Sequence, residues 1–172
     1  MDSLSALKII KEAVPHFILS DEISHGEAII IAKREHLLEI AGFLKNDERL
    51  SFNLLCDLFG VDYPKKAERI EVIYNFYSVT NNCRIFVKVR SKMDETGHPS
   101  LTPLYNAANW FEREVYDMFG LKFQGHPDMK RILNPDDWDG HPLLKDYPLR
   151  KRPTPDKLNY DTPGYVELDK LK

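Results

Sequence analysis

The sequence predicts an α+β fold, in which a small, mostly antiparallel sheet is covered by helices on one face and followed by an extended, Pro-rich C-terminal segment. Three observations predict it. Residues 69–90 contain two alternating runs separated by a short polar turn, the pattern of an antiparallel hairpin. Residues 103–119 follow a helical period with one apolar side. Seven of the eleven prolines lie between residues 127 and 163, where they disfavour regular structure because proline lacks an amide donor.

The length and composition fit one soluble domain with a core of ordinary size. The chain has 172 residues, of which 42% are hydrophobic and 30% are charged. Its net charge of -3 argues against a nucleic-acid-binding protein, which usually has a strongly basic face. No apolar run approaches the roughly 20 residues needed to span a bilayer. The N-terminus lacks the pattern of a signal or transit peptide, so we expect the chain to stay in the compartment where it is made.

The first part of the chain is expected to supply two helices and a strand. Residues 3–14 have helical spacing, with Ser3 as a suitable N-cap and Pro15 as a stop signal. The apolar side of this helix would carry Leu4, Leu7, Ile10 and Val14. Residues 27–32 form a short β-branched run and predict a strand. Residues 33–45 return to helical spacing, with one side formed by Leu37, Ile40, Ala41 and Leu44.

Three strand-like runs follow. Residues 52–59 carry apolar side chains at both alternating positions, which suits a central strand. Residues 69–76 and 84–90 alternate between apolar and polar side chains, so one face of this hairpin should meet water. Asn81 and Asn82 lie between the two runs and suit left-handed turn positions.

A helix over residues 103–119 should end at Gly120, which is a common residue just after a helix. At 100° per residue, one side of this helix is almost entirely apolar. We expect this side to cover the dry face of the sheet; it carries Leu104, Ala107, Ala108, Phe111, Val115, Met118 and Phe119.

The opposite side of this helix is polar, and is either a solvated surface or part of an interface. It carries Asn106, Arg113 and Asp117, with Tyr105, Glu112 and Tyr116 in a neighbouring row. Trp110 lies beside this row, and large amphipathic aromatics are enriched at interfaces. Glu114 lies at the edge of the apolar side, where a carboxylate would need a partner such as an arginine.

Three Gly-His-Pro sequences place His98, His126 and His141 in proline-containing loops. Metal-binding histidines usually form close pairs or accompany cysteine pairs, whereas these are separated by 28 and 15 residues. Cys56 and Cys83 lie in apolar, strand-like runs, as expected of small buried side chains. We therefore expect the histidines to make structural or docking hydrogen bonds, with a metal site as the alternative.

The motifs of the second half match those of a known family. "ERE" at 112–114 is followed at set spacings by Asp117, His126, Lys130 and "RIL" at 131–133. "DDWDGHPLLKDYPL" at 136–149 and "DLFGVDYP" at 57–64 match further motifs in the same order. On these residues the sequence resembles the 30-kilodalton subunit family of respiratory complex I, whose bacterial members are called the C subunit. The similarity covers roughly residues 25–150.

The resemblance implies an α+β core over residues 1–122 and an extended docking segment over 123–172 that is not an independent domain. It implies a structural subunit in the peripheral arm of proton-translocating NADH:quinone oxidoreductase, on the cytoplasmic side of the bacterial inner membrane. This subunit would dock on the quinone-site subunit (the D subunit) and its cluster-bearing neighbours. No catalytic site, metal or cofactor is expected on this chain; other subunits would bind NADH, FMN, the iron–sulfur clusters and quinone. The alternative is the equivalent subunit of a related membrane-bound hydrogenase or other-donor dehydrogenase.

The resemblance and the residue types together select a set of expected docking and motif residues. They are Glu112, Arg113, Glu114, Asp117, His126, Lys130, Arg131, Trp138, His141, Lys145, Asp146 and Tyr147. Trp138, Arg131 and Tyr147 are of the types that anchor interfaces. The four helix residues are expected to hold the junction with the C-terminal segment through charge-assisted bonds to Lys130, Arg131 or His126.

Overall fold

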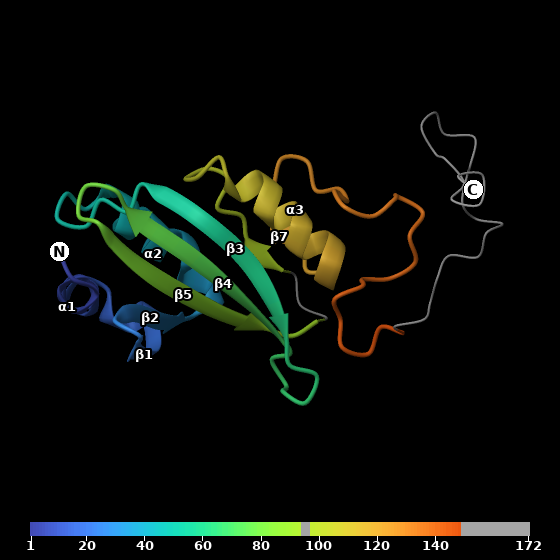
Figure 1. Ribbon diagram of the computed structural model, residues 1–172, viewed down its shortest axis with the longest axis horizontal. Helices are drawn as coiled ribbons and strands as arrows, with labels where there is room; N and C mark the ends of the chain where they lie inside the picture. The colour runs from blue at the N-terminus through green and yellow to red at the C-terminus, as the bar shows by residue number, and fades with distance from the viewer. Residues whose placement is uncertain (94–96, 149–172) are drawn as a thin grey trace, which may run out of the picture.

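A five-stranded mixed sheet forms the centre of the molecule (Figure 1). The computed structural model describes residues 1–93 and 97–148; the expected tail beyond residue 148 lies outside this range. In chain order the α-helices and strands are α1 (Ser3–Ala13), β1 (Ile18–Ser24), β2 (Glu27–Ala32), α2 (Leu37–Asn46), β3 (Leu54–Asp62), β4 (Ile70–Ser78), β5 (Cys83–Ser91), β6 (His98–Pro99), α3 (Ala108–Phe119) and β7 (Phe123–Gln124). Two short 3-10 helices, Pro15–Phe17 and Arg34–His36, precede β1 and α2. The sheet order is β1-β2-β5-β4-β3. Only β2 and β5 pair in parallel within this sheet, so the predicted α+β class is confirmed.

One face of the sheet packs against the helices, as expected. Alternate residues of β4 and β5 point into this core and are fully buried: Ile70, Val72, Tyr74, Phe76, Ile85, Val87 and Val89. The apolar side of α2 packs there as its spacing predicts, with Leu37, Ile40, Ala41 and Leu44 all buried. On the other face of β5, Lys88 and Arg90 are partly exposed. No helix of the described residues is long and apolar enough to cross a bilayer.

Helix α1 differs from the prediction in its cap and its buried side. The side chain of Asp2, rather than Ser3, accepts the amide hydrogen bond from Ser5 at 2.8 Å. Ser3 turns inward, and its hydroxyl donates to the carbonyl of Arg84 at 3.2 Å. Because of this rotation, Leu4 is exposed.

The strand predicted over residues 52–59 is present as β3, but the prediction that it is a central strand was wrong, because β3 lies at an edge of the sheet. The pairing of β3 with β4 shifts between Leu55 and Asp57. This bulge moves the alternation by one position, so Leu55 and Leu58 are buried while Leu54 is exposed. Apolar residues at both alternating positions therefore reflect a shift of register and not burial of both faces.

The hairpin of β4 and β5 is confirmed, but its expected wet face is found on β5 and not on the first half of β4, where Glu71 and Ile73 are buried. Its turn also differs from the prediction. Asn82 adopts the left-handed conformation, with φ of 48°. Asn81 does not; its side-chain amide instead donates to the carbonyl of Leu50 at 2.9 Å. Of the two cysteines, Cys83 is buried as expected and Cys56 is half-buried.

The last helix is shorter than predicted, because α3 begins at Ala108 and residues 101–107 form turns. Tyr105 is not on a wet face: it is buried, and its hydroxyl donates to the carbonyl of Phe52 at 2.7 Å. Glu114 is exposed, so the expectation that its carboxylate would need a partner such as an arginine was wrong. The buried carboxylates of α3 are Glu112 and Asp117. Gly120 ends the helix as predicted, with φ of 80°.

Candidate functional site

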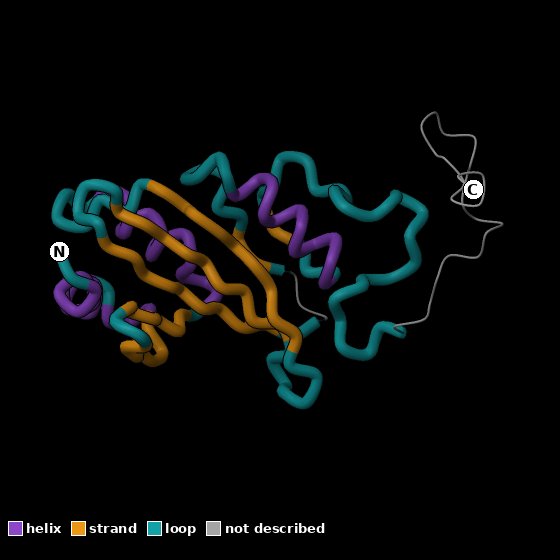
Figure 2. The backbone as a smooth tube through the Cα atoms, viewed as in Figure 1, coloured by secondary structure: helices purple, strands orange, loops and turns teal. Residues whose placement is uncertain are grey.

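Residues 125–148, here called the strap, contain turns but no helix or strand. The strap runs beside α3 and past its C-terminal end (Figure 2). A segment without regular structure must satisfy its buried backbone donors with other acceptors. In this protein, a carboxylate on α3 supplies many of them.

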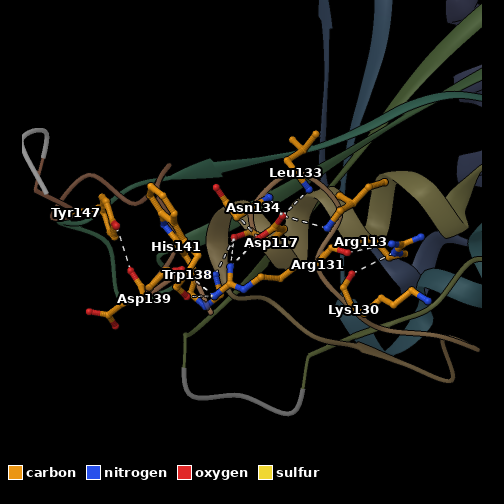
Figure 3. Close-up of polar contacts among 12 residues, drawn as sticks. Arg113, Asp117, Lys130, Arg131, Leu133, Asn134, Trp138, Asp139, His141 and Tyr147 are labelled. Carbon is orange, nitrogen blue, oxygen red and sulfur yellow. Dashed lines mark hydrogen bonds and ion pairs between the residues drawn. The ribbon is translucent and has the colours of Figure 1, made fainter. Parts of the chain in front are cut away.

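That carboxylate is Asp117, in the last turn of α3, which is fully buried. Its Oδ2 accepts backbone N–H bonds from Ile132 at 3.1 Å, Leu133 at 2.8 Å and Asn134 at 2.8 Å. Its Oδ1 accepts from Arg131 Nη1 at 2.6 Å and from Asn134 Nδ2 at 3.0 Å (Figure 3). A negative charge at a helix C-terminus is unfavourable by itself, and these five donors offset that cost.

Arg131 extends the junction to the later part of the strap. Besides the Asp117 carboxylate, its guanidinium donates to the carbonyl groups of Trp138 at 2.9 Å and Gly140 at 3.0 Å. The planar guanidinium holds several acceptors at fixed angles. Half-buried Trp138 is therefore fixed through its backbone.

Arg113 fastens the strap from one turn earlier on α3. Its Nε donates to the Lys130 carbonyl at 3.1 Å and its Nη2 to the Arg131 carbonyl at 3.0 Å. The guanidinium also lies over the ring of Trp110, 5.2 Å from the centroid. Arg113 therefore contacts the strap through backbone carbonyl groups.

The two strap histidines also bond to α3. His126 Nε2 lies 3.1 Å from the Asn109 carbonyl, and its Nδ1 accepts the amide of Asp128 at 3.0 Å. In this pattern Nε2 is the donor and Nδ1 is the acceptor. His141 Nδ1 donates to the Asp117 carbonyl at 2.9 Å. A Cβ atom at Gly120 would come within 2.7 Å of the His141 ring, so the helix end leaves room for this side chain.

A second polar cluster joins the strap to the sheet. Arg69 donates from Nε and Nη2 to the buried Asp62 at 2.6 and 2.8 Å. It also donates to Asp146 of the strap at 2.9 and 2.7 Å. The Lys145 amide donates to Asp62 at 2.7 Å. Arg69 was not among the expected residues. The one sequence feature that pointed to it is its position seven residues after Asp62 of the "DLFGVDYP" motif.

The electrostatics favour ionised carboxylates in both clusters. Burial alone would raise the pKa of Asp117, but hydrogen bonds from Asn134, Arg131 and Leu133 outweigh it and hold this pKa well below its ordinary range. Hydrogen bonds from Arg69 likewise lower the pKa of Asp62. Both junctions are therefore charged at neutral pH.

Acid should weaken these junctions. A carboxylate with a depressed folded pKa contributes stability above its unfolded pKa, and this stability is lost as the pH falls through the folded pKa. As the pH falls below about 4, we expect the free energy of unfolding to fall more steeply in wild type than in Asp62→Asn. Urea denaturation at a series of pH values measures this. Parallel pH profiles would contradict a depressed Asp62 pKa.

Other expected residues lie differently. Glu112 does not join the strap: Ser100 Oγ and the Leu101 amide donate to its carboxylate, each at 2.7 Å. The expected Glu112 junction was wrong because the preceding loop, not the strap, covers this side of α3. The exposed Lys130 side chain pairs with Asp128 at 2.7 Å. Tyr147 donates from its hydroxyl to the Asp139 carbonyl at 3.1 Å.

The third Gly-His-Pro histidine, His98, lies in the core. Its Nδ1 is 3.0 Å from the Tyr74 hydroxyl and its Nε2 is 3.1 Å from Ser91 Oγ. Burial lowers the pKa of His98 to about 3, so the ring is neutral. All three histidines thus make the expected hydrogen bonds. Among the residues that the structure describes, no group of three or more His, Cys, Asp or Glu side chains could hold a metal ion.

These features define a class: a small α+β protein whose extended segment is fastened to a helix and a sheet by two buried carboxylates. Residues 30–153 match the family described as "Respiratory-chain NADH dehydrogenase, 30 Kd subunit". The chain belongs to this family, as its sequence motifs indicate.

Relatives carry names consistent with this family. The chain is 43% identical over 149 residues to the C subunit of NADH-quinone oxidoreductase from Roseiflexus sp. (strain RS-1), covering 87% of this chain and 86% of that protein. It is 43% identical over 158 residues to the protein of the same name from Caulobacter vibrioides, covering 90% and 73%.

Two solved structures share the fold. A trypsin-resistant fragment of Nqo5 superposes with a TM-score of 0.63 at 32% identity, covering 72% of this chain and 98% of the fragment. A chain of the membrane-bound sulfane sulfur reductase, an archaeal respiratory membrane complex, gives a TM-score of 0.74 at 25% identity and covers 95% of this chain and 98% of its own.

Proposed function

We propose that this chain is a structural subunit of the peripheral arm of proton-translocating NADH:quinone oxidoreductase. It docks on the quinone-site subunit and its cluster-bearing neighbours, and supports electron transfer from NADH to quinone. Other subunits bind NADH, FMN, the iron–sulfur clusters and quinone. The chain lies on the cytoplasmic side of the bacterial inner membrane and contacts the membrane only through the complex.

The observation that carries this proposal is the family match over residues 30–153. The strap adds a physical argument for docking. Two leucines of the strap, Leu133 and Leu143, are 62% and 50% accessible, and Trp110 on α3 is 60% accessible. The backbones of both leucines are bonded to the last turn of α3. A surface that is fixed before binding loses less conformational entropy when a partner covers it.

The fixing contacts of the two leucines are specific. The Leu143 amide donates to the Met118 carbonyl at 3.1 Å, and the Leu133 amide donates to the Asp117 carboxylate at 2.8 Å. Both side chains therefore project from a backbone that α3 holds in place. Apolar side chains presented in this way are typical of protein–protein interfaces.

A second candidate function is the equivalent subunit of a membrane-bound complex with another electron donor or acceptor. The similarity to a chain of the sulfane sulfur reductase, over 95% of this chain, favours it. The two candidates predict the same docking role and differ in the partners and in the donor.

Double substitution of Leu133 and Leu143 by aspartate should impair assembly, because the charges would have to be desolvated at the interface. For this test, a gene that encodes the tagged variant replaces the native gene in its own host. We expect at least about a tenfold loss of co-purified quinone-site subunit and of membrane NADH:quinone activity, since a buried unpaired charge costs several kcal/mol.

The matched control is Leu19→Asp, which changes a leucine of similar exposure on the edge strand β1. This control should assemble and retain activity. Wild-type assembly of the double variant would contradict docking through the strap. Co-purification of nickel-site hydrogenase subunits, with no NADH:quinone activity, would support the second candidate.

A further inference from the structure

The carboxyl group of Glu112 is buried in the core without a cation. It is fully buried, and its contacts are the Ser100 hydroxyl and the Leu101 amide, each at 2.7 Å. No lysine, arginine or histidine of the described residues forms an ion pair with it. An ionised carboxylate in such a place is costly unless a proton can neutralise it.

Two hydroxyl groups connect this carboxyl group with the surface. Ser100 Oγ lies 2.7 Å from Glu112 Oε2 and 2.7 Å from Thr102 Oγ1. The Thr102 amide donates to Ser100 Oγ at 3.2 Å, which leaves the Ser100 hydroxyl proton free to point either way. Thr102 is partly exposed, so the row of oxygen atoms starts in the core and ends near solvent.

We propose that Glu112, Ser100 and Thr102 form a proton-exchange site, in which the buried carboxyl group takes up and releases a proton through the two hydroxyl groups. When Glu112 is protonated, it donates to Ser100, which donates to Thr102. On release, the Glu112 proton passes to Ser100 as Ser100 passes its own to Thr102, and Thr102 gives one proton to water. The hydrogen bonds of the row then point inward, and one proton has moved from the core to solvent.

Among the titratable groups of this cluster, Glu112 is the one whose charge changes near neutral pH. Burial raises the pKa of Glu112 to about 7, only partly offset by hydrogen bonds from Ser100 and Leu101. Burial, and then the Glu112 charge, raises the pKa of Tyr74 on β4. Burial, and then the charge of Arg34, lowers the pKa of His98 on β6 to about 3.

The site also lies close to the first residues of the strap. The backbone of the segment that carries Ser100 pairs with the chain just after α3: the Ser100 amide donates to the Gln124 carbonyl at 2.8 Å. The raised pKa favours folding below the unfolded value of Glu112, and this contribution is lost as the pH rises through about 7.

The first test is infrared spectroscopy of the full-length chain with 13C-labelled glutamate carboxyl groups, as a function of pH. We expect a protonated-carboxyl band that disappears with a midpoint near 7. Glu112→Gln should lose this band, whereas Glu114→Gln, which changes an exposed carboxylate on the same helix, should keep it. A wild-type chain that shows only midpoints near the ordinary glutamate value would overturn the proposal, whether or not Glu112→Gln folds.

The second test addresses the path of the proton. Thr102→Val removes the outer hydroxyl and leaves the contacts of Glu112 with Ser100 and Leu101. After transfer into D2O, exchange of the carboxyl proton should become about tenfold slower or more, because it would then require local opening of the core. Exchange at the wild-type rate would overturn the hydroxyl path.

Discussion

Replacement of Asp117 by alanine is expected to lower the free energy of unfolding by about 3–5 kcal/mol, because it breaks a buried ion pair and leaves the partner charge uncompensated. The amide groups of residues 132–134 lose their acceptor in the same step. Urea denaturation measures the loss. Limited proteolysis should show faster cleavage within the strap.

The control for this substitution is Asp128→Ala. Asp128 forms an ion pair with Lys130 on the same strap, but both side chains are 59% accessible. Exposed pairs of this kind contribute little to stability because water and salt screen them. Equal stability losses in the two variants would show that Asp117 does not hold the strap.

Gly60→Ala should also be strongly destabilising. A Cβ atom at Gly60 of β3 would lie 2.8 Å from two ring atoms of Phe119. Phe119 is buried in the core at the last turn of α3, so displacing its ring would disturb the side chains packed around it. Overpacking of this kind costs about 1–3 kcal/mol, which thermal or urea unfolding can measure.

Gly42→Ala is the matched control. Gly42 lies within α2, and a Cβ atom there would meet no atom within 4 Å. Alanine favours a helix over glycine by about 0.8–1 kcal/mol, so this variant should be more stable than wild type. If Gly60→Ala were equally well tolerated, β3 and α3 would not be packed as closely as described.

Periodicity predicted the parts of the fold that depend on one local pattern. The alternation in β5 and the apolar side of α2 are examples, because each of these elements has one buried side. Helix α3 is different. The sheet, the loop bearing Ser100 and the strap each cover part of it, so Glu112 and Asp117 are buried while Glu114 is exposed. A helical wheel places side chains around an axis, but it does not say how many neighbours cover the helix.

The candidate site was predictable to a similar extent. Residue types and family spacing predicted charge-assisted bonds from the helix residues to Lys130, Arg131 or His126, and the structure contains a pair of Asp117 with Arg131 at 2.6 Å. The contact between Arg69 and Asp146 spans 77 residues of sequence, and no local pattern marks it. Lys145 takes part through its backbone amide, which any residue but proline could supply.

The two polar clusters have a consequence for the order of folding. The strap contains no strand or helix, and the buried carboxylates that bind its backbone lie on α3 and at the end of β3. It can become ordered only after both of these elements are in place. The strap should therefore be a late-forming, separately opening unit, and its opening would leave the sheet and its helices intact.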